Sequence, residues 1–293
     1  MRIIALEEHY ATPAVREAWS KLGSADQDDS IKMFRDTEVD RQLDDLSDAR
    51  IRRMDECGVD VQVLSLTTPG VQALEADDAV ALSRQANDLV AATVRARPDR
   101  FQGFAALPTA APDAAAGELG RAVMELGLKG AMMFGRTRGR NADHPGFLPV
   151  YEAAAHLRVP IYLHPQTPPQ VVRGAYYSGF GDELDLHFAT GGIGWHYETG
   201  VQLLRLILSG VFDRFPGLQV ITGHWGEAVL FYLERINLLS RAAGRLQRPV
   251  ADYFRQNVHV VSVSRCPRLT ALAWRFRRPW LRGRPCSSRA GVR

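Results

Sequence analysis

Two residues near the start of the chain, Glu7 and His9, have side chains able to bind a metal ion. They end a short apolar run in the segment ALEEHY, and their i, i+2 spacing places both side chains on one face of an extended strand. A carboxylate oxygen and an imidazole nitrogen form a workable ligand pair for a divalent cation. The pair alone is weak evidence, because the same triplet also suits a solvated strand end.

His164 occupies an equivalent position after a later apolar run, in the segment VPIYLHPQ. Together with Glu7 and His9 it makes a set of two imidazoles and one carboxylate, which leaves coordination positions open for substrate or water. We therefore predict a site for one divalent metal ion, Zn²⁺ or Mn²⁺. The alternative is that His164 is a satisfied loop residue beside Pro165.

A third histidine, His224, lies in the segment ITGHWGE, where Gly223 and Gly226 allow the backbone to turn sharply. Glu227 follows three residues later and can orient the imidazole and raise its basicity. Arg235 lies about three helical turns beyond His224 and could reach a substrate carboxylate. We predict catalytic roles for His224, Glu227 and Arg235. A structural turn histidine and an ordinary surface arginine are the alternatives.

The elements that must position these residues alternate between strand and helix. Short apolar runs predict strands at 3–6, 61–66, 101–107, 128–134, 159–163, 218–222 and 258–263. Amphipathic stretches predict helices at 40–58, 77–97, 112–127, 149–158, 198–215 and 227–246. Such alternation is typical of a parallel sheet with helices packed outside it.

Two α/β architectures fit this order, a (β/α)₈ TIM barrel and an open, doubly wound sheet. The candidate residues follow several different strands, as they do at the C-terminal face of a barrel. No glycine-rich phosphate-binding fingerprint follows the first strand, which argues against a dinucleotide-binding sheet. We therefore predict a (β/α)₈ barrel, with seven recognisable βα units in residues 1–264.

The connection between the predicted strand at 159–163 and the predicted helix at 198–215 is unusually long and aromatic. Loops of this length in compact domains are usually functional, and aromatic side chains suit a flat, apolar ligand or a subunit contact. We predict that Trp195, His187 and Tyr197 line a substrate pocket, and we regard His196 as a further candidate. The alternative is a loop that packs on itself.

Composition excludes several classes of protein. Hydrophobic residues make up 46% and charged residues 24%, which is ordinary for a soluble globular chain. No uncharged apolar stretch is long enough to cross a membrane, and the N-terminus does not resemble a signal peptide. The three cysteines are too few and too scattered for a disulfide framework, so we expect a cytoplasmic protein.

The basic net charge of +3 comes from the end of the chain. Residues 265–293 contain nine arginines and no acidic residue, which leaves 27 basic against 33 acidic residues, a net charge of −6, in residues 1–264. The barrel itself is therefore mildly acidic and gives no support to nucleic-acid binding.

Several segments resemble one known family in the right order. These segments are ALEEHYATP, LSLTTPGVQ, RPDRFQGFAALP, YLHPQ and ETGVQLLRLILSGVFDRFPGLQVITGHWGE. They are similar to the amidohydrolase-related (amidohydrolase 2 type) aromatic acid decarboxylases, such as the γ-resorcylate and 2,3-dihydroxybenzoate decarboxylases. The resemblance runs from residue 1 to about residue 263. Its motifs are specific for the superfamily and less specific for the substrate.

The resemblance implies a distorted TIM barrel of the metal-dependent hydrolase type that holds one divalent metal. It also implies non-oxidative decarboxylation of a small hydroxylated aromatic acid without an organic cofactor. Glu7, His9 and His164 match the family's metal ligands. His224 and Glu227 match its H-x-G-E motif, and Arg235 matches an arginine near the substrate. The resemblance also implies a homodimer or homotetramer.

The chain departs from the family pattern after Val263. The family continues with an eighth strand that ends in an S-x-D-[YW]-P motif, whose aspartate is a metal ligand and the proton donor to the ring. Residues 265–293 are instead rich in arginine and proline and have no strand or helix periodicity, so the eighth strand is expected to be missing or replaced. An out-of-frame reading of a GC-rich gene would produce this composition, and a genuine basic tail is the alternative.

Two other functions stay open. The same ligand set can activate water for attack on an ester, lactone or amide, as in a metal-dependent hydrolase. The chain could also be a truncated and inactive member of the family.

We expect the chain as given to decarboxylate slowly or not at all, because no acidic residue follows Asp252 and general-acid catalysis is typically worth about 10²–10⁴-fold. Purified protein loaded with Mn²⁺ or Zn²⁺ and supplied with 2,6- or 2,3-dihydroxybenzoate should turn over well below about 1 s⁻¹, the lower end of the ordinary enzyme range. Faster turnover would show that the tail, or another acid such as Glu8, completes the site.

Overall fold

The computed structural model describes residues 2–23 and 28–261. The atypical tail predicted at 265–293, and with it the question of the eighth strand, lies outside the described residues. Within the described part, no helix is both long and apolar enough to cross a membrane.

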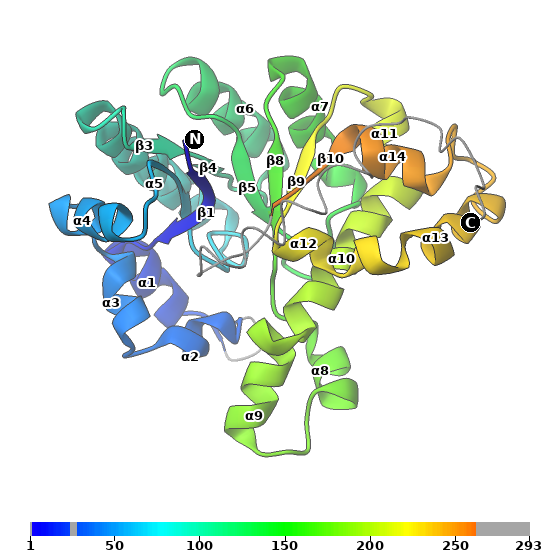
Figure 1. Cartoon of the computed structure of the whole chain (residues 1–293), viewed down its shortest axis with the longest axis horizontal. Coiled ribbons are helices and arrows are strands. Elements are labelled where there is room, and N and C mark those ends of the chain that lie inside the picture. The colour runs from blue at the N-terminus through cyan, green and yellow to red at the C-terminus, as the bar shows by residue number, and fades with distance from the viewer. Residues whose placement is uncertain (1, 24–27, 262–293) are drawn as a thin grey trace, which may run out of the picture.

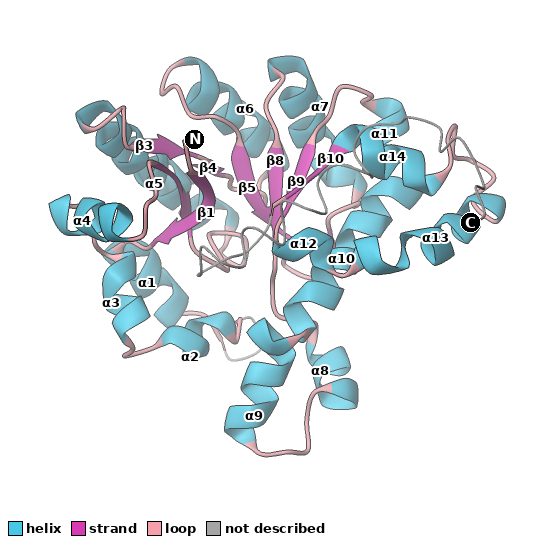
Figure 2. Ribbon diagram, viewed as in Figure 1, coloured by secondary structure: helices cyan, strands magenta, loops and turns pink. Residues whose placement is uncertain are grey.

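Parallel strands form the centre of the molecule (Figures 1 and 2). One sheet has three strands in the order β1-β2-β3, and the other has five in the order β10-β9-β8-β5-β4. The strands are β1 (Ile4–Tyr10), β2 (Val61–Leu66), β3 (Phe101–Gly103), β4 (Ala105–Ala106), β5 (Ala131–Phe134), β8 (Ile161–His164), β9 (Val220–Thr222) and β10 (Val258–Val260). A short antiparallel hairpin, β6 (Arg136–Thr137) and β7 (Arg140–Asn141), follows β5.

The two sheets meet where β3 runs into β4. The backbone N–H of Phe104 donates to the carbonyl of Leu64 at 2.8 Å, and the N–H of Ala105 donates to the carbonyl of Gly130 at 2.9 Å. The chain therefore passes from one sheet to the other within two residues, and the strands follow one another in sequence order. A doubly wound sheet reverses its order partway, so the observed order is that of a barrel. Strands β1 and β10 end the row, and among the described residues no pairing closes it.

Most predicted helices are present outside the strands. The helices are α1 (Pro13–Ser20), α2 (Ser30–Phe34), α3 (Glu38–Leu43), α4 (Asp48–Glu56), α5 (Ala76–Ala96), α6 (Pro112–Met124), α7 (Leu148–Leu157), α8 (Gln170–Tyr176), α9 (Asp182–His187), α10 (Gly194–Leu208), α11 (Val211–Arg214), α12 (His224–Glu227), α13 (Leu233–Ile236) and α14 (Val250–Asn257). The predictions of α5, α6 and α7 are confirmed within a few residues at each end. Helices α1, α2, α8, α9 and α14 were not predicted.

Three predicted helices are wrong as continuous elements. The helix at 40–58 is broken into α3 and α4, because Ser47 starts a new helix by accepting a hydrogen bond from the N–H of Ala49 at 3.2 Å. The helix at 198–215 is interrupted at Gly210, whose φ is 80°. The segment at 227–246 is a series of short turns, α12, Val229–Tyr232, α13 and Asn237–Arg241, because its first residues adopt left-handed conformations.

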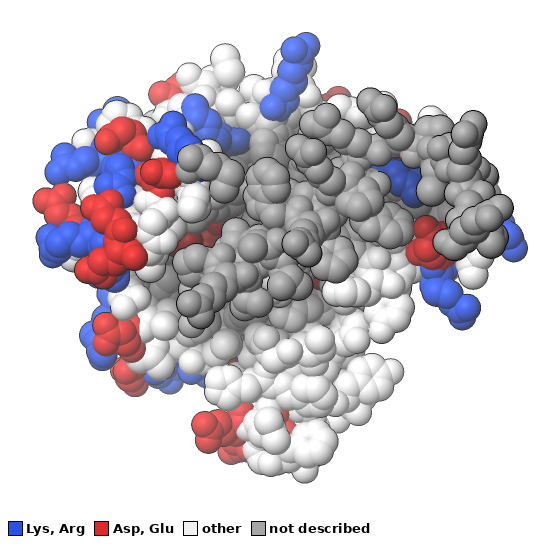
Figure 3. Space-filling view, viewed as in Figure 1, with Lys and Arg blue, Asp and Glu red and all other residues white. Residues whose placement is uncertain are grey.

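The long connection after β8 is mostly helical and not an open loop. Helices α8 and α9 extend away from the strands as an arm, and the chain returns through α10 (Figure 1). The ring of Phe188 packs edge-on against Tyr177 at 5.0 Å between centroids and lies 6.1 Å from Phe180. The connection therefore packs partly on itself, which is the alternative that the sequence analysis left open. In Figure 3 the arm carries few charges apart from acidic side chains of α9, whereas acids and bases are interspersed over α3 and α4.

Asn87 fastens the junction of the two sheets to the helices outside it. Its buried side-chain amide donates to the carbonyl of Ala106 at 3.0 Å and to Glu118 at 2.7 Å, while its oxygen accepts from the N–H of Ala106 at 2.7 Å. These bonds satisfy both backbone groups of Ala106, in β4, from α5. The contact ties α5 to the strand at which the chain passes from one sheet to the other.

We predict that Asn87→Ala lowers the free energy of unfolding by about 2–3 kcal/mol, because it leaves buried backbone groups without partners. Chemical denaturation measures this change. The control is Gln85→Ala, an exposed position on the same helix, which should change stability by less than about 0.5 kcal/mol. Equal stability of the two variants would refute the role given to Asn87.

Candidate metal and catalytic site

The candidate ligands meet at the C-terminal ends of the strands. Glu7 and His9 lie near the end of β1, and His164 is the last residue of β8. The Nε2 atoms of His9 and His164 are 3.0 Å apart. The Oε1 atom of Glu7 lies 3.1 Å from Nε2 of His164 and 3.8 Å from Nε2 of His9. Two imidazole nitrogens and one carboxylate oxygen therefore converge on one point, as the spacing of these residues predicted.

The opposite side of each ligand is held by another group. Nδ1 of His164 donates to the carbonyl of Pro165 at 2.7 Å, which directs its Nε2 at the convergence point. Nδ1 of His9 lies 3.2 Å from the hydroxyl of Ser65, on the neighbouring strand. The hydroxyl of Tyr162 donates to Oε2 of Glu7, which leaves Oε1 free to face the histidines. The donor set and its outer partners fit a divalent cation.

Electrostatics favours the ligating forms of Glu7 and His9. Burial alone would raise the pKa of Glu7, but attraction to the neighbouring His164, His9 and His224 outweighs it and holds that pKa well below its usual value. Burial lowers the pKa of His9 by more than the neighbouring carboxylate of Glu7 raises it. Burial and the neighbouring carboxylate of Glu7 raise the pKa of Tyr162, so its hydroxyl keeps its proton. An ionised carboxylate and a neutral imidazole are the forms that bind metal ions.

His224 joins this cluster from the turn after β9. Its Nε2 lies 3.3 Å from Oε1 of Glu7, and its Nδ1 lies 2.7 Å from Oε1 of Glu227. Burial alone would lower the pKa of His224. The hydrogen bond with Glu227 and attraction to the carboxylates of Glu7 and Glu227 together outweigh burial, so this pKa lies above its usual value. The pair predicted from the H-x-G-E segment is therefore close to the proposed ligands.

The backbone of this turn is strained. The φ angles of His224, Trp225, Gly226, Glu227 and Ala228 are all positive, between 45° and 82°. Such conformations cost on the order of 1–3 kcal/mol each for residues with a side chain and are concentrated at functional sites.

Gly223 is required at the start of the turn for a steric reason. A Cβ atom there would lie 2.6 Å from Oε2 of Glu7 and 2.8 Å from the hydroxyl of Tyr162.

His196 is a member of the site that the sequence hinted at only through its place in the aromatic connection. It lies near the start of α10, and its Nδ1 is 2.8 Å from Oε2 of Glu227. Its ring centroid is 4.8 Å from that of His224. His196, His224 and Glu227 thus form a second group of metal-ligand type beside the first.

The remaining candidates are less closely tied to the cluster. Trp195 is 7% exposed, donates to the hydroxyl of Thr167 at 3.3 Å, and has its ring 6.4 Å from His164. His187 and Tyr197 are exposed, at the end of α9 and on α10. Arg235 is exposed on α13 and pairs with no residue of the described part.

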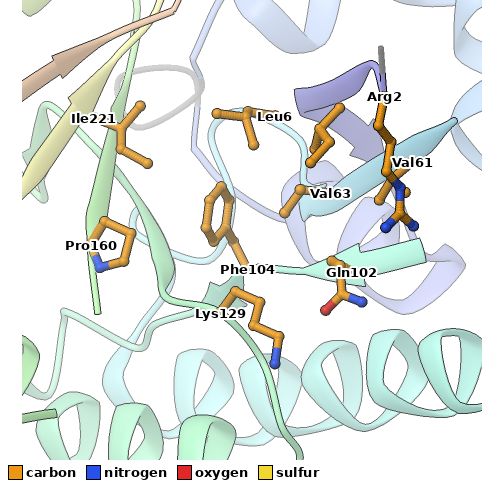
Figure 4. A pocket seen from close by; sticks show the side chains of 10 residues that line it. Arg2, Leu6, Val61, Val63, Gln102, Phe104, Lys129, Pro160 and Ile221 are labelled. Atoms are coloured by element: carbon orange, nitrogen blue, oxygen red, sulfur yellow. The ribbon is translucent and has the colours of Figure 1, made fainter. Parts of the chain in front are cut away.

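A separate cavity of about 340 Å³ opens at the other end of the strands (Figure 4). Its lining includes Arg2, Lys129 and Pro160, which precede β1, β5 and β8, together with the inward side chains of Leu6 and Phe104. None of the candidate ligands lines it, so it is separate from the chemistry described above.

Comparison with known proteins places these residues in a family context. The amidohydrolase family model matches residues 14–243. The chain is 37% identical over 278 residues to γ-resorcylate decarboxylase of Rhodococcus jostii, a match that covers 88% of this chain and 79% of that protein. Among solved structures it is similar to 5-carboxyvanillate decarboxylase of Sphingomonas paucimobilis, with a TM-score of 0.80, 33% identity, and coverage of 88% of this chain and 80% of that one.

A further solved structure contains a metal ion. Dihydroxybenzoic acid decarboxylase of Polaromonas sp. JS666, with bound manganese and the inhibitor 2-nitroresorcinol, gives a TM-score of 0.76 and 33% identity, over 93% of this chain and 82% of that one.

We predict that His164→Ala abolishes retention of a divalent metal, because it removes one of three converging ligand atoms. His156→Ala serves as the control, since this histidine is exposed in the last turn of α7. Metal content after dialysis, measured by elemental analysis, should fall to background in the first variant and stay at the unmodified level in the second. Equal losses in both would contradict the assignment.

Proposed function

This chain belongs to the amidohydrolase family, and within it we propose that the protein is a metal-dependent, non-oxidative decarboxylase of a hydroxylated aromatic acid. One observation carries the proposal: Glu7, His9 and His164 converge on one point, with His224 3.3 Å from Glu7, in a chain similar to decarboxylases of such acids. We propose Glu7, His9 and His164 as the ligands and Mn²⁺ as the preferred ion over Zn²⁺. The bound manganese of the Polaromonas enzyme supports that preference.

The bound ion would supply a Lewis acid for the carboxylate and ortho-phenolate oxygens of the substrate. Side chains of the protein must then deliver a proton to the ring. An ortho-hydroxybenzoate releases CO₂ readily only after its carboxylate-bearing ring carbon is protonated, because the alternative leaving group is a costly aryl carbanion. His224, held by Glu227, is placed to donate a hydrogen bond to the phenolic oxygen or to relay a proton, and its raised pKa favours the protonated form.

Other side chains are proposed to bind and shield the substrate. The ring of Trp195, which is buried beside His164, would form an apolar wall against the aromatic acid, with His187 and Tyr197 on the solvent side. Arg235 would pair with the substrate carboxylate, because its exposed guanidinium has no partner among the described residues.

We also propose that the protein is a homodimer or homotetramer. The arm of α8 and α9 exposes several large apolar side chains, which supports self-association through this surface: Val171, Tyr176, Phe180 and Leu184.

We predict that metal-loaded protein converts 2,6-dihydroxybenzoate into resorcinol and CO₂ in equal amounts, and that it cleaves no aryl ester or amide. Chromatography of long incubations detects even slow conversion, and His164→Ala supplies the metal-free background. Hydrolysis without CO₂ release would replace the proposal with a metal-dependent hydrolase. No reaction with any of these substrates at full metal content would identify an inactive family member.

A further inference from the structure

The carboxylate of Glu227 is shared between two histidines. Its side chain is 0% exposed, and each of its oxygens faces a different ring. Oε1 lies 2.7 Å from Nδ1 of His224, and Oε2 lies 2.8 Å from Nδ1 of His196. A carboxylate accepts hydrogen bonds, so each imidazole donates to it through Nδ1–H.

His196 is held in place by contacts other than its hydrogen bond to the carboxylate of Glu227. The preceding residue, Trp195, is buried and tied to Thr167 by its indole N–H at 3.3 Å. Helix α10 also packs closely on the turn that carries Glu227, because a Cβ atom on Gly200 would lie 2.7 Å from the carbonyl oxygen of Glu227. The position of His196 relative to the carboxylate is therefore fixed by packing of one segment on the other.

Loss of His196 would free the carboxylate to rotate. The terminal torsion of a glutamate is soft, with broad preferred angles. A fully buried oxygen left without a donor is costly, so the carboxylate would turn to seek another partner. Rotation moves Oε1 away from His224, whose Nε2 is directed at Glu7 only while its Nδ1 is held.

We propose that His196 is a positioning residue that fixes the carboxylate of Glu227 and, through it, the imidazole of His224. This inference rests on the proposed function for its effect on the reaction. The hydrogen bonds themselves can be observed without turnover. The neighbouring cluster of His196, His224 and Glu227 thus acts as an orienting clamp and does not hold a second metal ion.

The test compares His196→Ala with His196→Asn. Alanine removes the donor, whereas the asparagine amide nitrogen can donate from nearly the same position as Nδ1. His156→Ala, on the exposed face of α7, controls for loss of a histidine elsewhere. Each protein is loaded with Mn²⁺ for kinetics of CO₂ release from 2,6-dihydroxybenzoate and for metal content. Diamagnetic Zn²⁺-loaded samples labelled with ¹⁵N-histidine are used to follow the Nδ1–H proton of His224 by NMR.

We expect His196→Ala to lower kcat by about 10–100-fold, with KM and metal content unchanged. This is the range typical for loss of a residue that orients a site histidine or carboxylate by hydrogen bonding. Its His224 Nδ1–H signal should broaden through exchange with solvent. His196→Asn should recover most of kcat and a sharp signal.

An unchanged His224 signal in His196→Ala would overturn the inference whatever the activity. Loss of one metal equivalent in that variant would also overturn it, by showing that the cluster holds an ion. Absence of CO₂ release from the unmodified protein, with the expected pattern of NMR signals, would identify an inactive family member and leave the orienting contact established.

Discussion

The partly buried carboxylate of Glu7 is the centre on which the site depends. A charged group out of water is stable only when it is paired and hydrogen-bonded. Here Tyr162 donates to one oxygen, while the Nε2 atoms of His164, His224 and His9 lie 3.1, 3.3 and 3.8 Å from the other. These side chains come from β8, from the turn after β9 and from β1 itself. The order of the strands therefore brings these side chains together around Glu7. A shift in the register of β1 would separate them.

The same requirement explains the distorted turn after β9. His224 faces Glu7 through Nε2 while its Nδ1 faces Glu227. The chain reaches this arrangement through five consecutive residues with positive φ, and Gly223 leaves room for the oxygen of Glu7. The contacts of Glu227 with His224 and His196 are among the interactions that offset this strain.

Much of the site could be predicted from the sequence, because its signals are local. Glu7 and His9 share a strand face through their spacing, and apolar runs predicted the strands that end at His164 and before His224. Tyr162 was also within reach of such reasoning, since it lies two residues before His164 and so faces the same way. His196 could not be predicted in this way, because its contact with Glu227 depends on how α10 packs against a turn far along the chain.

The breaks within the helices predicted at 40–58 and 227–246 could not be predicted for a related reason. Apolar periodicity continues through a capping serine or a left-handed turn, so the pattern does not show where the backbone leaves the helix.

The central claim is that one cation binds between Glu7, His9 and His164. The most direct measurement is the anomalous diffraction of crystals grown with Zn²⁺, recorded at the zinc absorption edge. The account predicts a single strong peak about 2.0–2.2 Å from Oε1 of Glu7 and from the Nε2 atoms of His9 and His164. A peak between His196, His224 and Glu227, or no ordered peak near either group, would contradict it.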